Sequence, residues 1–148
     1  MSATTTTAIR PQPRSRTRAR TVTRRFVRTA WAASALFWGA LAVMEGMNHG
    51  ALAYLFAAVF FIAPDLTFLV AVRDARTARP GQLPPRAVPF YNAAHRALVP
   101  VALLVIYTYA PITWAPILAA LSGWIAHISM DRAFGYGLRT KEGFQRAH

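Results

Sequence analysis

The chain has 148 residues, which is room for one domain. It contains no cysteine, which excludes disulfide bonds and thiolate metal sites. Its formal net charge is +12, which in a soluble domain would indicate nucleic-acid binding, yet 55% of the residues are apolar. Eight of the seventeen Lys and Arg residues fall within the first 28 positions, and most others separate long apolar runs. This placement is typical of a membrane protein, so we expect no nucleic-acid partner.

Residues 1–25 form a polar tail rich in threonine and arginine. A segment with so few apolar residues cannot bury a core, and we expect it to be disordered in the cytoplasm. Its charge suits anionic lipid headgroups, at about 1 kcal/mol for each basic residue near the surface. The apolar run that follows is too long for a signal peptide, and three more such runs come after it. We therefore expect an uncleaved membrane anchor.

Residues 26–148 are expected to form one transmembrane domain. Each of its four apolar segments is close to the length of about 20 residues that crosses a membrane as a helix. Their approximate bounds are 26–44, 51–72, 88–110 and 116–138. The sequence thus predicts an all-α membrane protein, a bundle of four transmembrane helices in contact with the lipid bilayer.

The basic residues indicate how this bundle is oriented. The turns at 45–50 and 111–115 contain no Lys or Arg, whereas the tail, the loop at 73–86 and the C-terminal stretch are basic. By the positive-inside rule, the N-terminus, the C-terminus and the middle loop all face the cytoplasm.

Several ionisable residues lie inside the apolar segments, where a charge costs at least about 2.5–3.5 kcal/mol and usually faces the bundle interior. At the helical rise of about 1.5 Å per residue, Asp65, His95 and Asp131 lie roughly 12–13 Å inside the cytoplasmic edge. His127 precedes Asp131 by four residues, so both project from one helix face. Asn92 and His95 share a face in the same way. Three helices thus bring polar groups to one level.

Three interpretations of this polar cluster are open. The carboxylates can pair with His or Arg and only hold the helices together, as in an accessory or scaffold protein. Alternatively, the cluster binds zinc or another divalent metal, because imidazole nitrogens and carboxylate oxygens are normal zinc ligands. The third interpretation is an ion or proton conduit, since intramembrane acids and histidines also serve proton relays. The outer halves of the helices are nearly free of polar residues, which disfavours the conduit.

Three motifs occur in order: Pro-Asp-Leu at 64–66, Tyr-Asn-x-x-His at 91–95 and His-x-x-x-Asp-Arg-x-x-Gly-Tyr-Gly-Leu at 127–138. In these motifs the chain resembles the family called domain of unknown function 4260, small multi-pass membrane proteins of bacteria, over about residues 30–148. The resemblance implies a bacterial cytoplasmic (inner) membrane location. It also adds His148 as a metal ligand, because the family has a histidine there. It implies no reaction, because the family has no assigned activity.

The chain departs from the family pattern in three places. Ala147 stands where the family has threonine, and the loop between the second and third segments is longer and richer in Arg and Pro. The family also tends to carry a glutamate in the first helix, whereas Glu45 falls too late to match it.

We favour a membrane-embedded metal-dependent hydrolase that faces the cytoplasm and acts on lipid-like substrates. The expected metal ligands are Asp65, His95 and His127, with Asp131 as a fourth ligand or general base. The residues expected to position the substrate or stabilise an oxyanion are Asn92, Arg132 and Tyr136. A homo-oligomer or a larger membrane complex is compatible with the sequence.

Overall fold

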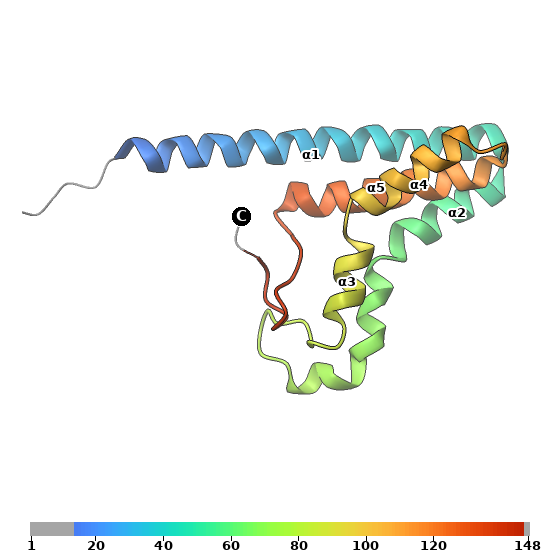
Figure 1. The fold of residues 1–148 in the computed structure, drawn as a ribbon. Coiled ribbons are helices and arrows are strands. Elements are labelled where there is room, and N and C mark those ends of the chain that lie inside the picture. The colour runs from blue at the N-terminus through green and yellow to red at the C-terminus, as the bar shows by residue number, and fades with distance from the viewer. Residues whose placement is uncertain (1–13, 147–148) are drawn as a thin grey trace, which may run out of the picture.

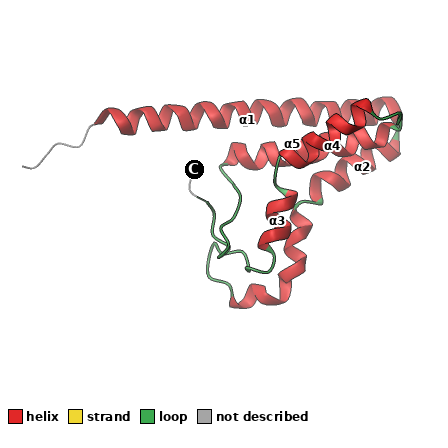
Figure 2. Cartoon of the chain, in the orientation of Figure 1, coloured by secondary structure: helices red, strands yellow, loops and turns green. Residues whose placement is uncertain are grey.

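The computed structural model describes residues 14–146. Within this range the chain is all-helical and forms no strand (Figure 1, Figure 2), which confirms that the fold is all-α. In chain order the helices are α1 (Arg14–His49), α2 (Ala51–Ile62), the 3-10 helix η1 (Asp65–Thr77), α3 (Val88–Ala94), α4 (Leu98–Tyr109) and α5 (Ala115–Phe134).

The first helix begins well before the first expected segment. α1 has 36 residues, and it includes residues 14–25, which we expected in a disordered tail. Arginine and alanine are good helix formers, so an Arg-rich stretch joined to an apolar helix can extend it. Residues 1–13, the rest of that tail, lie outside the described residues. Figure 1 shows the N-terminal part of α1 running past the end of α5.

Two of the expected transmembrane helices are broken. α2 and η1 are bent by 42° relative to each other, and α3 and α4 by 44°. Proline has no N–H to continue the helical hydrogen-bond ladder. Pro64 precedes η1 directly, and Pro100 lies in the first turn of α4. The segments 51–72 and 88–110, each expected as one helix, are therefore two helices each.

The last helix lies at the centre of the bundle. α5 packs against α1, α2 and α4. Small residues allow this close packing: a Cβ atom on Gly123 would overlap the carbonyl oxygen of Ala57 in α2. The hydroxyl groups of Ser34 in α1 and Ser129 in α5 are 2.9 Å apart and share a hydrogen bond. α5 ends at Gly135, whose φ of 92° stops the helix a few residues before the expected end near 138.

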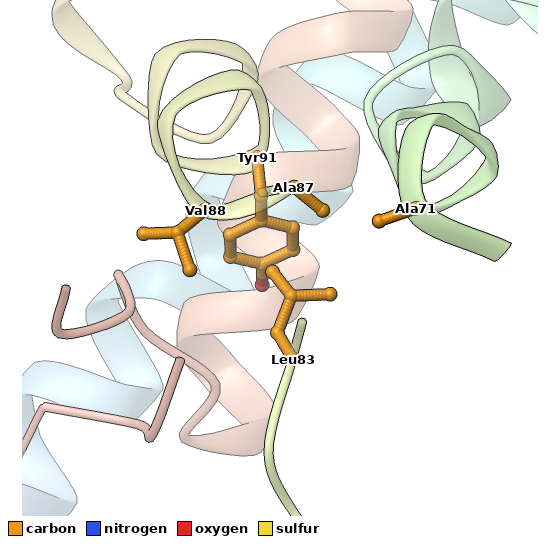
Figure 3. Close-up of a cluster of buried hydrophobic side chains, with 5 residues drawn as sticks. All are labelled: Ala71, Leu83, Ala87, Val88 and Tyr91. Atoms are coloured by element: carbon orange, nitrogen blue, oxygen red, sulfur yellow. The ribbon is translucent and has the colours of Figure 1, made fainter. Parts of the chain in front are cut away.

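Beyond the breaks, η1, α3 and the loop between them enclose a small hydrophobic core of their own. Figure 3 shows its five buried side chains, Ala71, Leu83, Ala87, Val88 and Tyr91. The C-terminal segment, residues 138–146, packs beside this loop. Its Gly143 carbonyl accepts a hydrogen bond from the Leu83 N–H at 2.9 Å.

Among the described helices, α1 alone is both long and apolar enough to cross a membrane by itself, which suggests a membrane protein. α1 could cross a membrane within Thr21–His49, where its most apolar 18-residue stretch has a mean hydropathy of 1.3, and up to three spans are available if each bent pair counts as one. α5 is long enough, at 20 residues, but its polar side chains lower its hydropathy. Four crossings and their orientation therefore stay predictions.

Candidate metal centre

Four side chains from three parts of the chain meet where the two helix breaks face α5. The Nε2 atom of His95 lies 3.3 Å from Nε2 of His127 and 3.5 Å from both Asp65 Oδ1 and Asp131 Oδ2. The Nε2 atom of His127 lies 3.6 Å from the same Asp65 oxygen and 3.8 Å from that of Asp131. The structure thus brings together Asp65, His95 and Asp131, which were expected at one level, and His127, which was expected on the same helix face as Asp131.

These separations fit the ligand shell of a tetrahedral cation. Zinc bonds of about 2.0–2.2 Å to nitrogen and oxygen place neighbouring ligand atoms about 3.3–3.6 Å apart. The five separations run from 3.3 to 3.8 Å. One ligand atom each of Asp65, His95 and His127 lies within 4.8 Å of the other two. Imidazole and carboxylate ligands suit zinc and several other first-row divalent ions.

The helix breaks explain why residues so far apart in sequence can meet. Asp65 is the first residue of η1, directly after Pro64. His95 is the residue that ends α3, so its side chain projects from the second break. His127 and Asp131 are one turn apart on the unbroken α5 and face both breaks.

The cluster is closed on the histidine side and open on the side of Asp65. The side chains of His95 and His127 are only 2% and 4% exposed, whereas those of Asp131 and Asp65 are 19% and 49% exposed. Phe61 covers His127 with an edge-to-face contact, at 5.4 Å between ring centroids. A reacting group can therefore approach the four ligand atoms past Asp65.

His95 is held in one orientation by Tyr91, one turn earlier on α3. Its Nδ1 atom lies 2.9 Å from the Tyr91 carbonyl oxygen, and the two rings stack with centroids 3.8 Å apart. A carbonyl can only accept, so Nδ1 carries a proton, and in the neutral ring Nε2 then presents a lone pair to the cluster. Metal-bound histidines almost always have such a partner on the other ring nitrogen.

Two side chains of α5 satisfy carbonyl groups that the break between α3 and α4 exposes. Trp124 Nε1 donates to the Ala94 carbonyl at 2.7 Å, and an Arg132 Nη2 atom donates to the His95 carbonyl at 3.1 Å. In a membrane interior, carbonyls freed by a helix break need such partners. The break is thereby fixed to the helix that carries the other two ligands.

The residues expected to position a substrate make bonds within the protein. Asn92 donates from Nδ2 to the Arg139 carbonyl at 3.0 Å and accepts the Arg139 N–H at Oδ1 at 2.7 Å. Arg132 also donates to the Tyr136 carbonyl at 3.1 Å, and the Tyr136 side chain is exposed. Their role toward a substrate stays a prediction. So does the role of His148, which lies outside the described residues.

Three further residues support the cluster, and the sequence reasoning did not assign them this role. Tyr91 was considered only as part of the Tyr-Asn-x-x-His motif, and neither Trp124 nor Arg139 was expected to contribute to the site. A usable signal was present, because each buried histidine has an aromatic residue one turn earlier on its helix: Tyr91 before His95, and Trp124 before His127. No comparable pattern pointed to Arg139, whose guanidinium lies 5.6 Å from the centroid of the Tyr91 ring.

Comparison with known proteins agrees with the resemblance seen in the motifs. The family model described as Domain of unknown function (DUF4260) matches residues 31–148, which is most of the chain. The chain belongs to this family. No curated protein and no solved structure matches it.

Proposed function

We propose that this family member is a multi-pass protein of a bacterial inner membrane that binds one divalent metal ion, with zinc as the first candidate, and hydrolyses lipid-like molecules. Asp65, His95 and His127 would hold the ion, and Asp131 would be a fourth ligand or the general base. The observation that carries the proposal is that the two imidazole nitrogens lie 3.3 Å apart and that each lies 3.5–3.8 Å from an oxygen of Asp65 and an oxygen of Asp131.

Four membrane crossings with both termini in the cytoplasm agree best with the distribution of charge. The Arg28 side chain of α1 donates to the Ala133 carbonyl near the end of α5, at 2.7 Å. The basic half of α1 and the basic C-terminal segment therefore lie at the same end of the bundle. The positive-inside rule assigns that end to the cytoplasm, where anionic lipid headgroups can bind it.

The chemistry would be divided between the ion and the side chains. A divalent ion held by these residues would supply a Lewis acid and would make water a nucleophile near neutral pH. Asp131 would accept the proton of the attacking water and return it to the leaving oxygen. With an acyl ester, the water oxygen bonds to the carbonyl carbon, the bond from that carbon to the alcohol oxygen breaks, and an acid and an alcohol are released. Amides and phosphoesters are hydrolysed by the same proton transfers.

The open side of the cluster favours a substrate that comes from the bilayer. Asp65 is followed on η1 by Leu66 and Leu69, and both leucine side chains are more than half exposed. An apolar approach at membrane depth suits a lipid better than a soluble metabolite, because a polar metabolite would lose its hydration on the way.

Two other functions make different predictions. If protonated histidines only pair with the two carboxylates, the cluster is a structural network in an accessory or scaffold protein, and it needs no metal. An ion conduit would require a polar path to the outer face. A groove of about 290 Å³ on the outer side of the bundle is instead lined by apolar and aromatic residues, among them Phe56, Phe60, Leu103 and Leu121.

Elemental analysis of the detergent-purified protein tests the proposal first. We expect near-stoichiometric zinc, or another divalent metal, in the wild type and its loss in a His95→Ala/His127→Ala double variant. His49→Ala is a matched control, because His49 pairs with Glu45 at the far end of α1, at 3.4 Å. No metal in the wild type after incubation with excess ion would rule out the hydrolase and favour the structural network.

A panel of acyl-ester, amide and phosphoester lipids in mixed micelles then tests hydrolysis by the metal-loaded protein. We expect turnover of at least one class, and its loss in the double variant. A metal-loaded protein that is inactive on all three classes would contradict a lipid hydrolase while leaving the metal site intact.

A further inference from the structure

We infer that Tyr91 and Asn92 are positioning residues of the metal centre and that the C-terminal segment, residues 138–146, acts on the metal through them. The inference rests on the proposed metal site. In this view Tyr91 and Asn92 orient the side chain of His95, the least exposed of the four site residues.

The first step is the contact between Tyr91 and His95. Tyr91 restrains the imidazole twice, because its carbonyl binds Nδ1 at 2.9 Å and its ring stacks on the imidazole. The Tyr91 ring is itself buried with Leu83 and Ala71 in the small core of Figure 3. The direction of the Nε2 lone pair of His95 therefore depends on where α3 lies.

The second step links α3 to the C-terminal segment. The Asn92 side chain forms a two-point hydrogen bond with the peptide N–H and carbonyl of Arg139, at 2.7 and 3.0 Å. The Arg139 guanidinium also lies over the Tyr91 ring, where a cation is attracted to the aromatic face. One residue of the C-terminal segment thus contacts both positioning residues.

The third step concerns the support behind the segment. Arg139 and Gln145 form an antiparallel bridge, so the segment folds back on itself. A Cβ atom on Gly143 would overlap the Leu83 carbonyl oxygen, which means that the segment and the loop before α3 are in close contact. Since the segment follows α5 directly, it ties α3 to the helix that carries His127 and Asp131.

A two-point clamp of this kind should matter for metal affinity more than for folding. Partners that orient a metal-binding histidine typically change affinity about 10–100-fold when they are removed. Without the Asn92 clamp, α3 can move relative to α5, and His95 no longer presents Nε2 at the distance that a shared ion needs.

The experiment measures zinc dissociation constants by chelator competition on the full chain in detergent. The test variants are Asn92→Leu and Tyr91→Leu. Tyr91→Phe keeps the ring and is the conservative variant, and Lys141→Met is the control, because Lys141 is an exposed residue of the same segment. Cobalt(II) replaces zinc in a parallel series, so that visible absorption bands report the ligand geometry.

We expect Asn92→Leu and Tyr91→Leu to bind zinc about 10–100-fold more weakly and to shift the cobalt bands. Tyr91→Phe and Lys141→Met should stay close to the wild type. Unchanged affinity in both leucine variants would overturn the inference while leaving the metal site intact. Weaker binding with unchanged cobalt bands would also overturn it, because this would indicate a loss of stability rather than of ligand orientation. A wild type that binds no metal would end both this inference and the proposed function.

Discussion

The Nε2 atoms of His95 and His127 lie 3.3 Å apart, although the two residues are 32 positions apart in the chain. Because Nδ1 of His95 donates to a carbonyl, its Nε2 has no proton of its own while the ring is neutral. Two bare nitrogens at this distance would repel each other. Either a proton shared by the two nitrogens or a metal cation bound by both would relieve this repulsion. The two possibilities predict different changes in the stability of the protein when metal is added.

Added zinc should stabilise the protein if the site binds it. At a free zinc concentration of 100 times the dissociation constant, the expected gain in unfolding free energy is about 2.7 kcal/mol. The gain should shrink on acidification, because protons compete for the same imidazole nitrogens. Thermal unfolding with and without zinc, followed by circular dichroism at two pH values, measures both effects. An equal midpoint with and without zinc would contradict binding.

The two carboxylates should have separable roles. Asp65→Asn removes a ligand charge and is expected to weaken metal binding at least about tenfold. Asp131→Asn should retain most of the metal but reduce hydrolysis by about 10²–10⁴-fold, because the amide cannot accept a proton. Metal content and turnover are measured on the same preparations. Loss of metal in Asp131→Asn would instead make this residue a required ligand.

Close packing between α2 and α5 should make Gly123 sensitive to substitution. Gly123→Ala is expected to destabilise the protein by about 1–3 kcal/mol, because its methyl group would overlap the Ala57 carbonyl. Gly39→Ala is the control, since nothing lies within 4 Å of a Cβ atom there. That variant should be neutral or slightly more stable, as alanine favours a helix by about 0.5–1 kcal/mol. Equal stability of the two variants in detergent unfolding would contradict this packing.

The hydrogen bond from Trp124 should stabilise the break between α3 and α4. Trp124→Phe keeps an aromatic ring but leaves the Ala94 carbonyl without its donor, at an expected cost of about 1–3 kcal/mol. Trp114→Phe serves as the comparison, because Trp114 lies directly before the start of α5 and is half exposed against Phe56. Its substitution should cost less than half as much. Chemical unfolding of both variants, followed by circular dichroism, measures the two losses of unfolding free energy. Equal losses would contradict a stabilising role of the Trp124 hydrogen bond.

The proposed topology can be tested by labelling single cysteine residues introduced by substitution, because the natural chain contains no cysteine. Asn48→Cys and Thr113→Cys should react with a membrane-impermeant maleimide added outside intact cells. Lys141→Cys should react only after the membrane is opened, since the C-terminal segment is expected in the cytoplasm. Labelling of Lys141→Cys in intact cells would reverse the orientation.

The sequence predicted the helical fold and the level of the site because both depend on local features. Apolar runs of about 20 residues and the spacing of His127 and Asp131 are properties of single segments. The second segment bends at Pro64, a residue that has no N–H to continue a helix. The break near His95 was not foreseen, although Pro100 removes the N–H that would bond to the Arg96 carbonyl.

The support around His95 could not be predicted in the same way, because it depends on contacts across the fold. Asn92 bonds to Arg139, 47 positions away, and Trp124 bonds to Ala94, 30 positions away. A polar asparagine beside a suspected ligand therefore seemed available to a substrate, whereas its side chain is engaged with the backbone of the C-terminal segment. The packing of α3 against the C-terminal segment determines which partner Asn92 binds, and no short sequence motif predicts that packing.

The short helices α2 and α4 have a consequence for the bilayer itself. Each has 12 residues, about 18 Å at the helical rise, whereas the hydrocarbon core is about 30 Å thick. If η1 and α3 lie outside the hydrocarbon core, lipids beside α2 and α4 would meet a hydrophobic mismatch, which would thin the membrane locally. The thinning would draw the cytoplasmic headgroup layer down toward Asp65, so acyl-chain length should tune access to the centre. Reconstitution in vesicles of increasing chain length, with turnover as the readout, should then give the highest rates in the thinner membranes.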